Sequence, residues 1–377
     1  MHMPYLAGAS AFAIACAAGL IPAAAGAQTS ALSSAQVSQV VVTAKRSVAE
    51  ANQLPQTTAS STGDQVELTT NVSTVEDELK YLPDVLIRER HIGDTQDPIT
   101  TRTSGVGSSA RSLVYEDGVL VSALIGNNNT NASPRWDLVS PDEVERTDVL
   151  YGPFSAAYPG NSIGEVVQIT TRMPTRFEAS GTIEGAAQAF SQYGTDRTFP
   201  TGRISATVGD RIGKLSFWLS AFHLDTESQP LYDVTATTPA SPSAAGTPVT
   251  GAFPALNRTG QPVQVLGAGG LEHQVEDSVN LKLAYDFTPA ITGLYAVGLF
   301  RQVDNAGVQT YLQNGAGAPV YAGSLNIGGY DYSVAPSAFD SDLYRLEEDH
   351  LAQSLTLRSR TGGTFDWELS ASDYAYL

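Results

Sequence analysis

The stretch that decides the fold is Val279-Asn280-Leu281-Lys282-Leu283-Ala284-Tyr285-Asp286-Phe287. Large apolar residues occupy the odd positions, and polar or small residues occupy the even positions. Successive side chains of a β-strand point to opposite faces, so this period predicts a strand with one apolar and one polar face. The same alternation runs from Leu215 to Ala221 and from Phe365 to Ala371. The apolar face would cover the core of a soluble sandwich or meet the lipid around a membrane barrel, and alternation alone allows both.

The connections between strands separate these alternatives. We predict seven strands, near residues 176–192, 199–210, 213–228, 275–288, 291–304, 350–361 and 364–377. Short turns fall at 209–213, 288–290 and 361–363, and long Gly, Pro, Ser and Thr-rich loops fall at 229–274 and 305–349; the brief connection at 193–195 is an exception. Tight turns at one end and long loops at the other are typical of outer-membrane barrels. Such loops are unusual inside a compact soluble domain.

Composition argues against several classes of protein. The chain has 377 residues and a formal net charge of −18, which disfavours binding to nucleic acid. Its only cysteine, Cys16, lies in the leader, so the mature chain is predicted to have no disulfide and no cysteine nucleophile. The five histidines are scattered without metal-site spacing. We therefore predict no metal, no cofactor and no enzymatic activity, and interpret carboxylates such as Asp94 and Asp97 as solvated loop charges.

The first 27 residues have the form of a signal peptide. The segment from Tyr5 to Ala27 is almost purely apolar and small, and it ends in Ala25-Gly26-Ala27, an A-x-A cleavage signal. The leader departs from type because its first residues include His2 but no Lys or Arg. Residues 1–27 are therefore predicted to direct export.

Residues 28–72 are rich in Ser, Thr, Gln and Ala and are predicted to be a flexible periplasmic segment. Within it, residues 37–46 form a β-branched run that could pair with the sheet edge of another protein. An ordinary short strand is the alternative.

A small α+β domain is predicted at 73–173, with a capping box at Ser73–Glu76, a helix stopped by Pro83, a hairpin at Glu116-Asp117-Gly118, and strands at 144–150 and 166–171.

Four blocks follow one another in this domain, at residues 81–85, 114–119, 144–153 and 157–172. Their order closely resembles the plug signature of the TonB-dependent outer-membrane transporters, carried here by Asp117, Gly118, Glu145, Arg146, Gly152, Pro153 and Gly164. Pro159 and Glu165 stand where this family usually has glycine, and Gln168 stands where it usually has Asn. These departures concern the fine geometry of the plug.

The resemblance implies an α+β plug followed by an antiparallel transmembrane β-barrel of about 22 strands. Residues 176–377 would be its first strands, and we expect the chain to be a fragment of a receptor of roughly 800 residues. The implied location is the outer membrane of a Gram-negative bacterium, in contact with its lipid. The β-branched run then resembles a TonB box that binds TonB and its inner-membrane energising complex through Val40, Val41, Val42, Thr43 and Ala44.

The resemblance also suggests where a ligand binds. A polar loop at 126–136 would face outwards, and its amides and Arg–Trp pair could grip an oxygen-rich or anionic ligand through Asn127, Asn128, Asn129, Arg135 and Trp136. The implied cargo is scarce and bulky, with an iron–siderophore complex as the default and haem, cobalamin or a glycan as alternatives. A non-transporting surface receptor and an exported β-rich enzyme are the rival functions.

Overall fold

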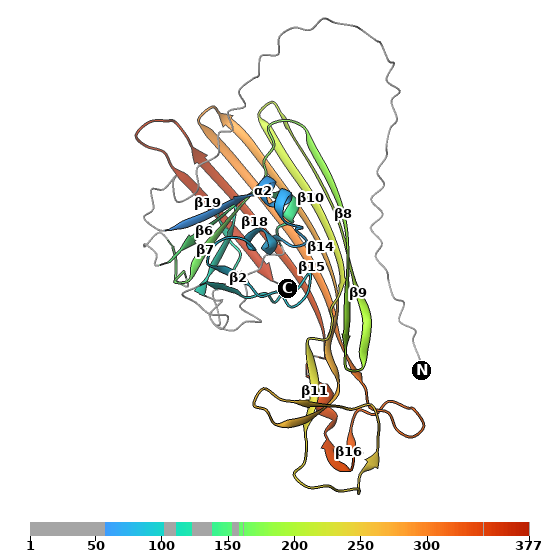
Figure 1. The fold of residues 1–377 in the computed structure, drawn as a ribbon. Coiled ribbons are helices and arrows are strands. Elements are labelled where there is room, and N and C mark those ends of the chain that lie inside the picture. Colours follow the sequence, from blue (N-terminus) through green and yellow to red (C-terminus); the bar gives the residue numbers. More distant parts are fainter. Residues whose placement is uncertain are drawn as a thin grey trace, which may run out of the picture. The chain divides into compact units, whose positions relative to one another are not determined.

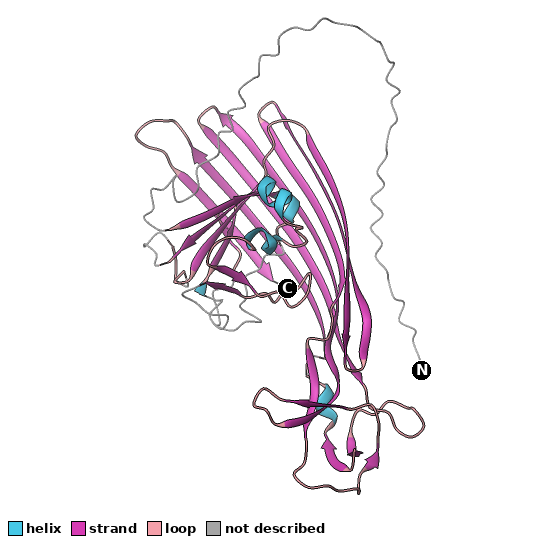
Figure 2. Cartoon of the chain, in the orientation of Figure 1, coloured by secondary structure: helices cyan, strands magenta, loops and turns pink. Residues whose placement is uncertain are grey.

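The computed structural model describes residues 57–101, 111–122, 138–152, 158–160, 162–341 and 343–376. The chain divides into two compact units, Met1–Lys45 and Arg46–Leu377, and every described residue belongs to the second. The second unit holds a large antiparallel sheet and a smaller α+β domain, which we call the plug (Figures 1 and 2). None of the helices in the described ranges has the length and apolar character needed to cross a membrane.

The large sheet contains the seven predicted strands. Its path is β19-β18-β15-β14-β10-β9-β8, and all of these pairs are antiparallel (Figure 1). The strands are β8 (Glu178–Gln192), β9 (Thr195–Ile212), β10 (Leu215–Glu227), β14 (Pro262–Thr288), β15 (Ile291–Thr310), β18 (Tyr344–Ser359) and β19 (Glu368–Tyr376). In the described residues β8 and β19 are the two ends of this path and do not pair with each other.

This sheet buries its polar face and exposes its apolar face, which is the reverse of a sheet in a soluble sandwich. On β14, the polar side chains at every second position from Glu272 to Lys282 are buried, because they face the plug. The apolar side chains between and beyond them are uncovered: Val279 is 46% exposed and Phe287 is 53% exposed. Leu299 on β15 and Leu355 on β18 extend this apolar face at 53% and 50% exposure. The polar face therefore lines the interior, as the barrel interpretation predicts.

The long connections are not the irregular loops that the sequence suggested. They contain β11 (Tyr232–Thr237), β12 (Thr247–Pro248), β13 (Phe253–Leu256), β16 (Gly323–Ile327), β17 (Tyr330–Val334) and the 3-10 helix η4 (Pro336–Phe339), and β14 and β15 extend well into them. β12 pairs with β16 in parallel, which joins two distant stretches of chain. Val249, Leu325 and Tyr332 share one apolar core. Neither connection can bury these side chains alone, so local sequence did not reveal the module.

The short β8–β9 connection is also explained by this module. Tyr193 turns the chain with φ 51°, and its ring packs against Phe253 of β13. A Cβ added to Gly194 would lie 2.5 Å from the ring of Tyr311, so only glycine permits this contact. Thr195 Oγ1 and the Tyr311 hydroxyl lie 2.7 Å apart. The β8–β9 turn is thus covered by the module of the two long connections and has no long loop of its own.

The plug is built on a five-stranded sheet of order β1-β6-β7-β4-β5, with a separate β2-β3 hairpin. In the ranges described, its elements are β1 (Thr58–Thr62), α2 (Gly63–Thr69), η1 (Val75–Leu79), β2 (Val85–Ile87), β3 (Ile99–Thr101), β4 (Leu113–Glu116), β5 (Val119–Leu120), η3 (Pro141–Glu143), β6 (Val144–Tyr151) and β7 (Glu165–Thr171). The predicted hairpin at Asp117-Gly118 is confirmed: both residues have positive φ, 47° and 89°.

Two predictions for the plug differ from the structure. The expected amphipathic helix after Ser73 is a single 3-10 turn at η1, and its capping box joins Thr74 to Asp77, one residue later than expected. Residues 58–69, placed by the sequence in the polar segment before the plug, form β1, which pairs antiparallel with β6, and α2, which carries its own capping box from Thr62 to Gln65. The hydrogen bonds of β1 come from a strand more than eighty positions away in sequence, so composition could not indicate this order.

Candidate functional site: the interface between plug and sheet

The plug meets the large sheet chiefly through the inward side chains of β14. We call the contacts of Glu272, Gln274, Asn280 and Lys282 with the plug the β14 contact. It follows the strand from its end near the long connections to the region beside the short turns. One strand therefore meets several separate plug elements, and the alternation of β14 determines which side chains do so.

Lys282 forms a buried ion pair in this contact. Its Nζ lies 2.7 Å from Asp117 Oδ2, and the two side chains are only 6% and 10% exposed. Lys282 Nζ also donates to the Thr171 carbonyl at 3.1 Å. Asp117 in turn accepts from Thr171 N at 3.0 Å and Thr171 Oγ1 at 2.7 Å. A residue of the plug signature thus both shapes the β4–β5 turn and holds the plug to the sheet.

Asn280 forms the next part of the β14 contact. Its Nδ2 donates to the Leu138 carbonyl at 2.8 Å and to Glu143 Oε1 at 2.5 Å. Gly298 on β15 leaves the space for this side chain, because a Cβ there would lie 2.5 Å from Asn280 Oδ1. Burial raises the pKa of Glu143 to about 7, although bonds from Ser140 N and Asn280 favour its charged form.

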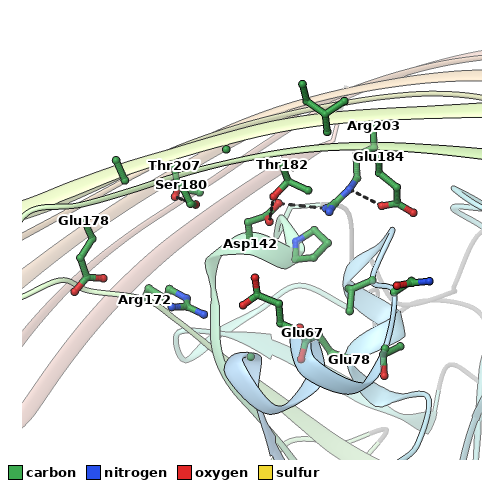
Figure 3. Close-up of a pocket in the computed structure, with 18 of the residues that line it drawn as sticks. Glu67, Glu78, Asp142, Arg172, Glu178, Ser180, Thr182, Glu184, Arg203 and Thr207 are labelled. Atoms are coloured by element: carbon green, nitrogen blue, oxygen red, sulfur yellow. Dashed lines mark hydrogen bonds and ion pairs between the residues drawn. The ribbon is translucent and has the colours of Figure 1, made fainter.

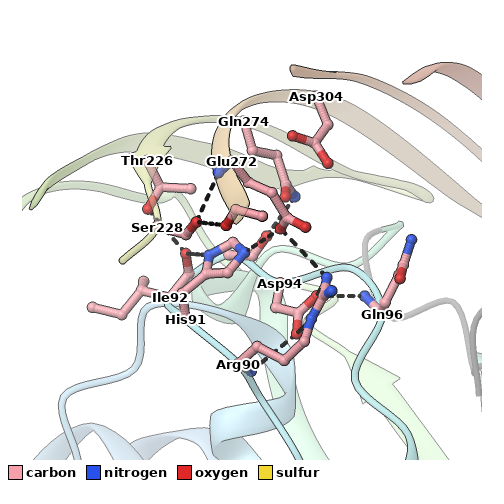
Figure 4. A network of polar contacts seen from close by, with 12 residues as sticks. Arg90, His91, Ile92, Asp94, Gln96, Thr226, Ser228, Glu272, Gln274 and Asp304 are labelled. Atoms are coloured by element: carbon pink, nitrogen blue, oxygen red, sulfur yellow. Dashed lines mark hydrogen bonds and ion pairs between the residues drawn. The ribbon is translucent and has the colours of Figure 1, made fainter. Parts of the chain in front are cut away.

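The far end of β14 meets the plug loop between β2 and β3 (Figure 4). Glu272 Oε2 lies 2.8 Å from His91 Nε2 and 3.4 Å from Arg90 Nη2. Arg90 also forms a bidentate ion pair with Asp94, with donor–acceptor distances of 2.8 and 2.7 Å. Asp94 and Asp97 are fully buried at 1% and 0% exposure, so the interpretation of these residues as solvated loop charges is wrong. The bound arginine compensates for the buried charge of Asp94.

A second group of contacts joins the plug to β8 and β9 through Asp142 of η3. Asp142 accepts from Thr182 Oγ1 at 2.8 Å and from Arg203 Nη1 at 3.2 Å. Ser205 Oγ donates to the same carboxylate at 2.5 Å, and Arg203 Nε reaches Glu184 at 3.1 Å. We call this group the Asp142 contact. Figure 3 shows Arg203 between the two carboxylates.

A cavity of about 780 Å³ lies beside the Asp142 contact (Figure 3). Plug residues on one side and β8–β9 residues on the other line it, and its lining includes five carboxylates but only two guanidinium groups: Glu67, Glu78, Asp142, Glu178, Glu184, Arg172 and Arg203. By contrast, a cavity between the plug and strands β14, β15 and β18 measures about 30 Å³. The plug therefore packs closely on one part of the sheet and loosely on another.

The first elements of the plug border this cavity. β1 pairs with β6 from Thr58 to Thr62, and the helix α2 follows at once. A Cβ on Gly63 would lie 2.2 Å from the Val144 carbonyl, so α2 approaches β6 as closely as a backbone can. A side-chain ion pair joins Asp64 of α2 to Arg172 at 2.9 Å, and Asp64 is 81% exposed. An exposed pair of this kind contributes little stability.

The structure places some, but not all, of the predicted site residues. Gly152 N donates to the Gly164 carbonyl at 3.2 Å, so two signature glycines meet. Arg146 pairs with Asp148 at 2.8 Å, and Glu145 lies half-buried on β6. The TonB-box candidates Val40, Val41, Val42, Thr43 and Ala44 lie outside the described residues, as do Asn127, Asn128, Asn129, Pro153, Arg135 and Trp136.

Sequence reasoning missed the residues that join plug and sheet. Asn280 and Lys282 were recognised only as polar positions of a strand, and Asp142 and Arg203 were not singled out. One signal was available: the inward positions of β14 from 272 to 282 are all polar or charged, so any segment that buries them must supply hydrogen bonds or opposite charge. The partner itself could not be identified, because it lies more than a hundred residues away.

Comparison with known proteins supports this arrangement. The sequence model of the TonB-dependent Receptor Plug Domain matches residues 50–166, which includes β1 and α2. The ferric enterobactin receptor PirA of Pseudomonas aeruginosa is 42% identical over 59 residues, which are 15% of this chain and 8% of that protein.

Solved receptors share the fold. A variant of the ferric enterobactin receptor PfeA from Pseudomonas aeruginosa, in complex with enterobactin, has a TM-score of 0.57 at 14% identity, over 85% of this chain and 41% of that one. The siderophore receptor PirA from Acinetobacter baumannii has a TM-score of 0.52 at 17% identity, over 84% of this chain and 39% of that one. The chain thus spans well under half the length of these receptors. The sequence match shows that residues 50–166 are a plug domain of the TonB-dependent receptor type, and the solved receptors share the fold of the chain.

Proposed function

We propose that this chain is the plug-bearing part of an outer-membrane receptor that takes up a bulky iron–siderophore complex with energy from TonB. The relatives named above are ferric enterobactin and siderophore receptors, which supports an iron chelate as cargo. The family consists of transporters and receptors rather than enzymes.

One observation carries the membrane part of the proposal: the sheet exposes its apolar face and buries its polar face. On β14 the apolar positions run from Val279 to Phe287. A tilted transmembrane strand needs about 9–11 residues, which this stretch satisfies. Beyond it on the same face lie the cross-strand ion pairs of His223 with Asp277 and of His273 with Asp225. Polar histidine–aspartate pairs at the end of an apolar band suit the boundary between lipid and water.

The geometry also suggests how a pull on the N-terminal segment would act. TonB would bind residues 40–44, and force would reach β1 first, because β1 is the first described element after that segment. β1 is held by five antiparallel residue pairs, and α2 by a close backbone contact and an exposed ion pair. The β14 contact is buried and would hold the remainder of the plug. Removal of β1 and α2 would widen the cavity beside β8.

Uptake is tested with the full-length gene in a deletion strain under iron limitation. We expect growth on ferric catecholate siderophore, loss of growth when the gene or tonB is deleted, and restoration by the intact gene. Haem, cobalamin and oligosaccharides are tested in parallel as alternative cargo. Growth that depends on the gene with one of these alone would replace the assignment of an iron chelate. Binding of the chelate without TonB-dependent accumulation would indicate a non-transporting receptor.

The coupling step has its own test. A peptide of residues 37–46 should bind the C-terminal domain of TonB, whereas the same peptide with Val41→Pro should not, because proline removes a backbone donor from the strand. Equal binding of both peptides, or of neither at high concentration, would remove this segment from the mechanism. Heat-modifiable migration and membrane fractionation of the full-length protein test the barrel independently.

A further inference from the structure

The plug loop between β2 and β3 is held to the sheet by its backbone. Gln229 Nε2 donates to the Arg90 carbonyl at 2.8 Å, and Thr226 Oγ1 donates to the Ile92 carbonyl at 3.0 Å. Gln274 Nε2 donates to the Gly93 carbonyl. Gly93 has φ 81°, and a Cβ there would lie 2.5 Å from the Leu224 side chain. The loop therefore lies directly against β10 and β14, with three neutral donors of the sheet on its carbonyls.

His91 lies in the middle of this contact and is buried, with its side chain 1% exposed. Its Nδ1 lies 3.0 Å from the Ile92 carbonyl, which can only accept a hydrogen bond. Its Nε2 lies 2.8 Å from Glu272 Oε2. Glu272 also accepts from the Arg90 guanidinium at 3.4 Å and from the Tyr344 hydroxyl at 3.0 Å, as expected for an ionised carboxylate. With an acceptor at each ring nitrogen, both nitrogens carry hydrogen, and the geometry requires an imidazolium.

Charged groups face His91 from several elements (Figure 4). Its own loop supplies Arg90 and Asp94, and β14 supplies Glu272 and, through Gln274, Glu276. β15 supplies Asp304, and β18 supplies the Tyr344 hydroxyl, whose single hydrogen is shared between Asp304 at 2.8 Å and Glu272 at 3.0 Å. β10 faces the site with the neutral Thr226, and the residue that follows the strand, Ser228, is neutral as well. A neutral His91 would leave Arg90 alone against several carboxylates in a buried site. Loss of the proton would thus both break a hydrogen bond and leave negative charge uncompensated.

The pKa of His91 follows from these surroundings. Burial alone lowers it, but the hydrogen bond to Glu272 and the field of Asp94 outweigh burial and raise it above the ordinary value. A histidine whose pKa is raised by folding stabilises the folded contact fully below its unfolded pKa of about 6.5. That stabilisation is lost as the pH rises through the raised pKa. The contact should therefore be strongest in mildly acidic solution and weaken toward alkaline pH.

We propose that His91 is a proton-operated clamp that holds the β2–β3 loop of the plug against β10 and β14 when protonated and releases it when neutral. The clamp goes beyond cargo uptake, because it sets the mobility of one plug loop whatever the ligand is. The local sequence does not reveal this role of His91, because its acceptor Glu272 lies 181 positions away in the chain.

Hydrogen–deuterium exchange of the full-length protein in detergent tests the clamp. After correction for intrinsic exchange, protection of a peptide covering 88–98 should fall at least tenfold between pH 6 and pH 9. In His91→Gln the loop should exchange fast at every pH. In Glu272→Gln, which leaves the loop sequence intact, the transition should move to lower pH. His223→Gln removes an outward-facing histidine that also pairs with an aspartate, and should keep the wild-type profile.

Peptides from β6 and β7 report whether a variant is folded, and they should stay protected throughout. A wild-type profile that is flat from pH 6 to pH 9 would overturn the clamp. So would an unchanged transition in a folded His91→Gln or Glu272→Gln protein. Because no cargo is added, these results do not depend on the outcome of the uptake test.

Discussion

Along β14 the plug and the sheet are in close polar contact, whereas at β8 and β9 the Asp142 contact borders a cavity of about 780 Å³. Both regions use charged side chains. On β14 the Lys282–Asp117 pair is almost fully buried, at 6% and 10% exposure. In the Asp142 contact, Arg203 is buried, but its partners Asp142 and Glu184 are 18% and 27% exposed and border the cavity.

The difference shows that burial, and not the number of ion pairs, decides how firmly each side is held. A buried charge that loses its partner remains uncompensated, and this costs several kcal/mol. A partly exposed charge that loses one partner can be solvated, so the loss is small. The β14 side is therefore expected to stay in place under conditions in which the β8–β9 side loosens. Four substitutions test this comparison.

The largest effect is expected for Lys282→Met, which leaves Asp117 buried with only Thr171 as its hydrogen-bond donor. We expect a loss of about 3–5 kcal/mol in the free energy of unfolding, measured by denaturant titration of the full-length protein in detergent. Lys214→Met is the control, because Lys214 is exposed in the turn between β9 and β10 of the same sheet. Equal effects of the two substitutions would remove the distinction drawn for β14.

Glu143→Gln should change the pH dependence of the same contact. The pKa of Glu143 is raised from 4.5 to about 7, mainly by burial, so its contribution is fully present below 4.5 and is lost as the pH rises to about 7. Glu143 should contribute a loss of roughly 1.4 kcal/mol per pH unit within that window, so the stability of the variant should fall by about that much less per unit than that of the wild type. Unfolding titrations at pH 5, 6 and 7 measure this, with Glu145→Gln on β6 as the control. Parallel profiles of wild type and Glu143→Gln would contradict the assignment.

Asn280→Ala removes the donor to Leu138 and Glu143 without removing a charge. A buried acceptor left without its donor costs about 1–3 kcal/mol, so this effect should be smaller than that of Lys282→Met. Asn305→Ala, at an outward-facing contact with Arg345, should change the unfolding free energy by only a few tenths of a kcal/mol. If the two alanine variants were equally stable, Asn280 would not contribute to holding the plug.

Asp142→Asn should have the smallest effect on stability, less than about 1 kcal/mol, because Arg203 keeps Glu184 and water reaches the site. It should instead open the cavity. The rate at which a water-soluble maleimide labels Ser180→Cys, a position that lines the cavity, should rise when Asp142→Asn is added. A loss of stability as large as that of Lys282→Met would show that the two sides are held alike.

Much of the fold was predictable from local pattern. The period of two from Val279 to Phe287 determines which side chains share a face, because the geometry of an extended chain alone enforces it. Asp117-Gly118 determines a tight turn, since few residues accept positive φ at both positions. The order of the plug blocks predicts a plug domain of the TonB-dependent receptor type, and the sequence match over residues 50–166 confirms it.

Tertiary structure alone decided which partners these elements meet. Residues 58–69 look like a polar tail but form a strand and a helix, because β6 supplies the hydrogen bonds of β1. The two long connections look like loops but fold together around Val249, Leu325 and Tyr332. Local sequence thus sets strand periodicity, turns and family signature through short-range geometry. The pairing of Lys282 with Asp117 and of His91 with Glu272 depends on chain segments brought together only by folding.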